Sequence, residues 1–196
     1  MAYIALADVK TYGDWASSDD DTLLGALITR AQQTIDTFTG RTFECTSDDS
    51  AAHYLNSVDD VDGRYLYVGD DLNTIDSITV GTDTIPSTDY AYQPRNVKPI
   101  YRLRMLSHSP YAWSDYATDP DDNIVITGQW AYSSSAPVDI QHACLRLVKW
   151  MYNQRTSGAD VDRPVLDPTG VMIMPMDLPA DVFKLLMPYR KQMVMG

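Results

Sequence analysis

The chain has 196 residues, of which 44% are hydrophobic, so it is long enough to bury a core and too apolar to be disordered throughout. Its formal net charge is −12 and its pI is about 4.4, which argues against a generic nucleic-acid-binding protein because such proteins carry a basic surface. The sequence has no charged-then-apolar leader and no apolar run long enough to cross a bilayer, so we expect no membrane association.

Amphipathic periodicity predicts two helices in the first forty residues. The first is short, over residues 6–12, and Gly13 follows it as a stop. The second spans residues 21–38 and ends before Gly40, because glycine takes the left-handed conformation at no steric cost. The apolar residues of the second helix recur at helical spacing and are Leu23, Leu24, Leu27, Ile28, Ala31, Ile35 and Phe38.

Residues from about 50 to 130 follow a different period and predict a small, mostly antiparallel β region. Short segments of β-forming residues alternate there with clusters of turn residues. Gly81 is expected in the tight turn of a hairpin. The predicted strands are 52–55, 64–68, 75–80, 84–85, 90–92, 100–103 and 124–130.

Helical spacing returns over residues 137–155. Pro137 is expected at the first position of this helix, where its missing N–H costs nothing. Glycines and prolines then interrupt residues 156–178, so no regular helix can run through them. A last helix is expected over residues 179–192.

The predicted fold class is therefore α+β. Four helices, over residues 6–12, 21–38, 137–155 and 179–192, are expected to form a helical bundle. The small antiparallel β region, about residues 50–130, is inserted between them. We expect residues 1–156 to be the core of the protein and residues 157–196 to be an extended C-terminal arm that includes the last helix.

Residue patterns that are typical of catalysis or of cofactor binding are missing from the sequence. Neither common glycine-rich phosphate loop occurs. The serines at 133–135 lack the context of a nucleophile and are interpreted as a loop. His53, His108 and His142 have no partner at metal-ligand spacing, so we interpret them as structural or surface residues. We predict no catalytic residue, no cofactor and no metal ligand.

An acidic run and the two cysteines leave alternatives open. The aspartates within 59–62 are interpreted as a solvated turn, with an irregular calcium site as the alternative. An EF-hand fails because aligning Gly63 with its invariant glycine puts Val58 where a carboxylate is needed. Cys45 and Cys144 are predicted to be two buried thiols, with a single disulfide as the alternative.

The C-terminal segment is rich in methionine, with six of the nine methionines in the last 25 residues. Methionine adapts to irregular surfaces, so we predict that this segment docks on another subunit or partner. The alternative is that these methionines fill gaps in the core. The predicted docking residues are Val171, Met172, Ile173, Met174, Met176, Leu178, Val182, Leu185, Leu186, Tyr189 and Arg190.

Four stretches of the chain resemble motifs of the head–tail connector (adaptor) proteins of long-tailed, siphovirus-like bacteriophages. Residues 6–12, LADVKTY, resemble the opening L-x-D-V-K-x-Y of that family. Residues 21–43 are similar to its D-x-L-L…A…I-x-x-[YF]-T-G-R-x-F helix and cap. Residues 125–143 resemble its strand, aromatic turn and P-x-[DE]-[IL]-x-x-A helix entry, and residues 178–190 resemble its C-terminal helix.

The resemblance implies a structural protein of the virion neck, at the head–tail junction, that is assembled in the host cytoplasm and is not an enzyme. It implies a homo-oligomeric ring of twelve subunits under the portal protein, with a stopper or tail-completion protein below. Double-stranded DNA would pass through the ring without specific binding, and aspartates facing the channel would let it slide. The helices would make the ring contacts and the C-terminal segment would dock on the portal or a neighbouring subunit. The expected ring-packing residues are Leu24, Leu27, Ile28, Ala31, Ile35, Ile140, Leu147 and Met151.

Two other functions remain as alternatives. A tail-terminator or stopper protein of the same neck would lack the paired helices 22–38 and 137–154. A small ligand-binding or hydrolytic domain could assemble a site from scattered carboxylates, although nothing in the sequence selects a pair of them.

Overall fold

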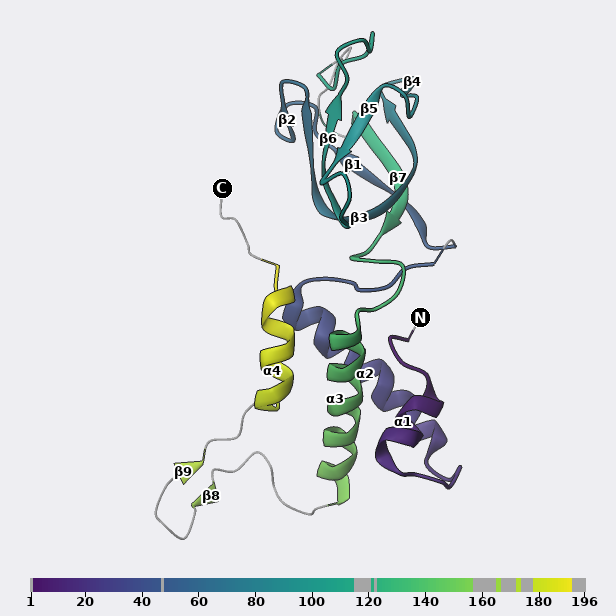
Figure 1. The fold of residues 1–196 in the computed structure, drawn as a ribbon, viewed down its shortest axis with the longest axis vertical. Coiled ribbons are helices and arrows are strands. Elements are labelled where there is room, and N and C mark those ends of the chain that lie inside the picture. Colours follow the sequence, from purple (N-terminus) through teal and green to yellow (C-terminus); the bar gives the residue numbers. More distant parts are fainter. Residues whose placement is uncertain are drawn as a thin grey trace. The chain divides into compact units, whose positions relative to one another are not determined.

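The computed structural model confirms the α+β class (Figure 1). It describes residues 2–46, 48–114, 121, 123–156, 165–166, 172–173 and 178–191. The chain divides into two compact units, which we call the helical unit (Met1–Arg41 with Pro137–Gly196) and the β unit (Thr42–Ala136). The helical unit is thus closed by the two ends of the chain, and the β unit is an insertion.

Four α-helices make up the helical unit: α1 (Leu6–Gly13), α2 (Asp21–Thr39), α3 (Val138–Thr156) and α4 (Ala180–Leu186). The helices α1, α2 and α4 all pack against α3. No helix among the described residues is long and apolar enough to span a membrane. The buried apolar side chains of the unit are Tyr3, Ile4, Val9, Leu24, Ile28, Ala31, Ile35, Ile140, Ala143, Cys144, Leu147, Val148, Leu178, Val182 and Leu186.

The ends of the first two helices follow the chemistry of their residues. Gly40 is left-handed, with φ 67°, and donates its N–H to the Asp36 carbonyl at 2.8 Å, as predicted. The stop predicted at Gly13 is wrong by one residue, because Gly13 is the last residue of α1 and Asp14 is the left-handed residue, with φ 61°. Aspartate is among the few residues with a side chain that tolerate this conformation.

The last helix is shorter than predicted. It is α-helical only to Leu186 and continues as a 3₁₀ turn, Met187–Tyr189, so the prediction of a helix to residue 192 is wrong. Pro188 explains the change because it has no N–H with which to continue the α-helical hydrogen-bonding pattern. Helix α3 was also predicted to start with a proline, Pro137, but it begins one residue later, at Val138. The Pro137 carbonyl accepts the Gln141 N–H at 3.0 Å.

The β unit is one antiparallel seven-stranded sheet. Its main path runs β1 (Ser50–Leu55), β7 (Ile124–Trp130), β3 (Tyr65–Val80), β6 (Ile100–Met105) and β5 (Tyr90–Gln93). Two short strands, β2 (Val61–Asp62) and β4 (Asp83–Thr84), also pair with β3. The hairpin predicted at Gly81 is confirmed, since Val80 pairs with Asp83 and Gly81 has φ 58°.

Strand β3 replaces two separate strands of the prediction. Segments 64–68 and 75–80 were expected to be independent, but they belong to one strand of 16 residues. Its first half pairs with β6 and its second half with β7, and the register shifts between Tyr67 and Leu72, around the left-handed Gly69. Such irregularities bend a strand without ending it. The bent sheet encloses the buried residues Leu66, Val68, Leu72, Ile78, Val80, Ile85, Ile100, Leu103, Met105, Trp113, Ile124 and Ile126.

Candidate interaction surfaces

Helix α4 turns one face into the helical unit. Val182 and Leu186, four residues apart, have no exposed surface, and Leu178 just before the helix is 9% exposed. Helix α4 contacts both α3 and α2. These three predicted docking residues therefore lie in the core of the subunit itself. Leu185 and Tyr189 are half-buried and Arg190 is exposed.

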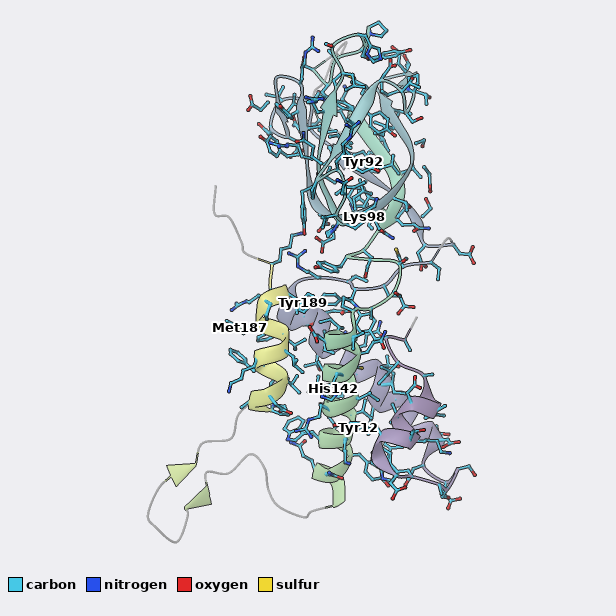
Figure 2. The ribbon with its side chains drawn as sticks, in the orientation of Figure 1. Tyr12, Tyr92, Lys98, His142, Met187 and Tyr189 are labelled. Carbon is cyan, nitrogen blue, oxygen red and sulfur yellow. The ribbon has the colours of Figure 1, made fainter. Side chains whose placement is uncertain are left out.

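The adjoining side of α4 and of the 3₁₀ turn, about 100° around the helix from Val182 and Leu186, carries exposed apolar side chains that are not among the predicted docking residues. Phe183 is 38% exposed and Met187 is 46% exposed, again four residues apart. The ring of Phe183 lies 5.5 Å from that of the half-buried Phe38 on α2, and the Arg190 guanidinium is 5.8 Å from the Phe38 ring. We call Phe38, Phe183 and Met187 the α4 outer strip. Figure 2 labels Met187 at its end, beside Tyr189.

Polar contacts fix both ends of α4. At its start, the Arg146 guanidinium pairs with Asp181 at 2.6 Å. This pairing raises the pKa of Arg146, and it lowers the pKa of Asp181 against the opposing effect of burial. At its far end, Arg41 Nε donates to the Tyr189 carbonyl at 2.7 Å. Because both ends are held, the exposed positions of α4 have a defined orientation.

Six of the eight expected ring-packing residues are buried within the helical unit. Leu27 and Met151 are half-buried. The six therefore stabilise the subunit, and their part in ring contacts stays a prediction. The buried six are Leu24, Ile28, Ala31, Ile35, Ile140 and Leu147.

Part of the predicted arm forms a small sheet. The strand β9 (Met172–Ile173) pairs with β8 (Val165–Leu166), with Ile173 opposite Val165. This confirms an extended backbone at Met172 and Ile173. The docking residues Val171, Met174 and Met176 lie outside the described residues.

The helical unit holds the half-buried carboxylate of Asp36 near the buried thiol of Cys144. The Tyr3 hydroxyl donates to Asp36, and Tyr3 is 4% exposed. Burial raises the pKa of Asp36 above its ordinary value, and the Tyr3 hydrogen bond offsets part of this. Burial, with a smaller contribution from Asp36, raises the pKa of Cys144 to about 12. A thiol with this pKa is protonated at neutral pH and is a poor nucleophile.

The groups that could carry chemistry are dispersed and engaged in structural contacts. His53 stacks on Trp130 with ring centroids 3.6 Å apart, and His142 meets Tyr12 edge to face at 6.0 Å (Figure 2). The Ser133 hydroxyl lies 3.1 Å from the Phe43 carbonyl. Within the described ranges, no three His, Cys, Asp or Glu side chains converge to hold a metal ion.

The backbone forms the predicted turn at the acidic run, and the two cysteines are the predicted buried thiols. In the turn, the Asn56 side-chain oxygen accepts the N–H groups of Val58 and Asp59, and Asp60 accepts the Asn56 N–H at 2.8 Å. These bonds define a turn closed by an Asn side chain. Cys45 and Cys144 are both free and buried, so the disulfide alternative is wrong.

Comparison with known proteins gives a family match and a shared fold. Residues 2–192 match the family model described as head completion protein. A chain in the structure "Neck of empty GTA particle computed with C6 symmetry" aligns with a TM-score of 0.57 and 17% identity, covering 99% of this chain and 92% of the other. A chain in "Virion of native gene transfer agent (GTA) particle" aligns with a TM-score of 0.58 and 16% identity over the same shares. The search of curated proteins found no significant match.

Proposed function

Because this chain belongs to the head completion protein family, we propose that it is a structural protein of the neck of a phage-like particle, where it completes the head and joins it to the tail. The observation that carries the proposal is the length of the family match, which leaves only one residue before it and four after it. The shared fold with chains of a gene transfer agent neck and virion supports the same location. The membership also confirms the resemblance to phage head–tail connectors.

We further propose that twelve copies form a ring under the portal and continue its DNA channel. A ring of twelve is compatible with the sixfold symmetry used for the gene transfer agent neck. The packing of α2 against α3 favours a connector over a stopper or tail terminator, for which we expected no such pair. The excess of acid supports a channel wall that repels DNA.

The α4 outer strip is the proposed contact with the portal or with a neighbouring subunit. Its three apolar side chains lie on elements that are packed against α3 and held by polar contacts. An apolar group on a rigid element loses little conformational freedom on binding, which favours affinity. Residues 157–177 of the arm, with their apolar segment, would extend the same contact.

Particle assembly in vitro tests this role. Heads made without the protein should stay tailless, and adding the purified chain should restore joined particles, counted by electron microscopy. The variant Phe183→Asp with Met187→Asp should fold but restore few joined particles, because it places charge on the proposed contact. Gln33→Asp, at an exposed position of α2, is the matched control and should restore joining.

Solution mass gives a second readout. Copies of the protein should form a ring in solution, or should form one when the portal protein is added. A chain that stays monomeric and ignores the portal would contradict the ring, and full joining by the doubly substituted variant would contradict the role of the α4 outer strip.

A further inference from the structure

The β unit concentrates its few cations in one short stretch. It carries five Lys or Arg against fifteen Asp or Glu, a net charge of −10. Four of those five cations, Arg95, Lys98, Arg102 and Arg104, fall within ten residues that include most of β6. A unit this acidic thus has one basic surface.

Strand pairing sets two of these arginines among tyrosines. Arg102 and Arg104 alternate with the buried Leu103 and Met105, so they project from the outer face of β6. Arg102 pairs with Tyr67 of β3, and Arg104 pairs with Tyr65. The Arg102 guanidinium lies 4.7 Å from the Tyr65 ring centroid and 5.9 Å from that of Tyr67.

An open hollow of about 670 Å³ lies over this surface. Its lining includes Arg95, Arg102 and Arg104 together with Tyr67, Tyr92 and Tyr101, and we call it the basic–tyrosine hollow. No carboxylate lines it among the described residues. None of the three arginines forms an ion pair within the described ranges. Lys98 flanks the hollow, with its Nζ 5.1 Å from the Tyr92 ring centroid (Figure 2).

We propose that the basic–tyrosine hollow binds an extended acidic segment of another protein chain, with carboxylates two residues apart. Alternate residues of a strand are about 7 Å apart. Arg102 and Arg104 are alternate residues of β6, so their spacing matches that of alternate side chains in an extended ligand. Stacking on tyrosine orients a guanidinium and leaves the N–H groups at its edge free to bind a carboxylate with two hydrogen bonds. This proposal concerns a different surface from the α4 outer strip and does not depend on the neck assignment.

A duplex nucleic acid fits this surface less well than a short peptide does. The phosphates of a duplex continue past any hollow of this size, and here they would meet a unit with a net charge of −10. Exposed charges still repel one another over about 8 Å at physiological salt. A peptide of a few residues can end before it reaches the acidic surface, and the hollow has the volume of a site for a ligand of that size.

Titration calorimetry of the full-length protein at low salt tests the proposal with two peptides. Both have eight residues, three aspartates and five threonines; one has aspartate at its first, third and fifth positions, the other at its first, fourth and seventh. The first should bind several-fold tighter than the second. The double variant Arg102→Gln with Arg104→Gln should bind the first peptide about tenfold more weakly, since two charged pairs are lost. Arg64→Gln removes the fifth cation of the β unit, outside the hollow, and should leave binding unchanged.

A second variant covers the case in which loss of the Arg102 stack unfolds the β unit. Arg95→Gln with Arg104→Gln changes two exposed side chains, keeps Arg102 on Tyr65 and should also weaken the peptide. Absence of peptide binding, equal affinity for both peptides, or tighter binding of a 12-base-pair DNA duplex would each overturn the proposal.

Discussion

The two units of the chain are similar in length but differ in charge. The helical unit carries ten Lys or Arg against twelve Asp or Glu, a net charge of −2, whereas the β unit carries most of the net negative charge, −10 of −12. The candidate surface on the first is the apolar α4 outer strip, and that on the second is the basic–tyrosine hollow. We infer that partners of the helical unit are recognised by burial of apolar surface and partners of the β unit by charge, so the two should respond differently to substitution and to salt.

The largest effect is expected from Val182→Asp in the helical unit. Val182 has no exposed surface, so the change loses apolar burial and places a carboxylate in the core. We expect a loss of about 4 kcal/mol in the free energy of unfolding of this unit. Thermal unfolding followed by circular dichroism at 222 nm, which reports the helices, measures it.

The neighbouring residue supplies the control for that change. Phe183→Asp adds the same charge at a position that is 38% exposed, so it should cost clearly less, about 2 kcal/mol, which reflects loss of the ring's partial burial against Phe38. Equal destabilisation by the two variants would mean that α4 does not have one inner and one outer face, and the α4 outer strip would then be no candidate for docking.

Gly128→Ala tests the β unit in the same way. A Cβ at Gly128 would lie 2.1 Å from the Thr74 carbonyl oxygen on the paired strand, so the backbone of β3 or β7 must move. We expect a loss of about 3 kcal/mol, confined to the β unit. Hydrogen exchange measured separately on peptides from β3 and from α3 shows which unit opens.

The matched control for Gly128 is a glycine in the helical unit. Gly25 lies inside α2 and has nothing within 4 Å of an added Cβ. Gly25→Ala should therefore stabilise the helical unit by about 0.5–1 kcal/mol. Faster exchange in α3 as well as in β3 on Gly128→Ala would show that the units open together, and the comparison between them would lose its thermodynamic meaning.

The sequence predicted the elements whose faces and ends depend on residues close together in the chain. The period of Leu24, Ile28 and Ile35 predicted α2, and Gly40 predicted its end. The sequence did not predict β3 as one strand, because Gly69 looks locally like a turn and only pairing with two distant strands keeps the chain extended through it. The end of α4 could have been predicted, since Pro188 stands in the sequence and its effect on hydrogen bonding is general.

The candidate surfaces were harder to predict than the elements that carry them. Val182 with Leu186 and Phe183 with Met187 are both apolar pairs four residues apart, so periodicity alone cannot say which pair faces the core. The cluster of cations around β6 is visible in the sequence. The pairing of these cations with Tyr65 and Tyr67 is not, because those two tyrosines come from β3 and are placed by the register of the sheet.

Asp36→Asn sharpens the comparison between the units, because Asp36 is a half-buried acid of the helical unit. Burial raises its pKa in the folded state, so as pH rises through the ordinary value the unfolded chain loses its proton first and folding becomes less favourable. Asparagine does not titrate and can still accept the Tyr3 hydroxyl. We expect the variant to be more stable than the parent at pH 7, with the difference shrinking toward pH 3, in thermal unfolding followed at 222 nm.

An exposed aspartate is the control for this pH dependence. Hydrogen bonds from Thr46 lower the pKa of the exposed Asp49, so Asp49→Asn should change stability with pH in the opposite direction, with the parent the more stable of the two at pH 7 and the difference shrinking as pH falls. A parent protein that is more stable than Asp36→Asn at pH 7 would mean that the charged carboxylate stabilises the fold through Tyr3, against the direction expected from burial.

The smallest expected effect is that of salt, and it compares the two units directly. The Debye length falls from about 10 Å at 0.1 M salt to about 3 Å at 1 M, so salt screens the repulsion within a unit of charge −10 far more than within one of charge −2. At 1 M salt, hydrogen exchange should slow in β3 and hardly change in α3. The slowing in β3 should correspond to a gain of about 0.5–1 kcal/mol in the free energy of unfolding of the β unit. Asp59→Asn with Asp62→Asn removes two exposed charges and should reduce that gain. An equal gain in both units would point to a general effect of salt on apolar burial, in which case the excess of acid in the β unit does not set its stability.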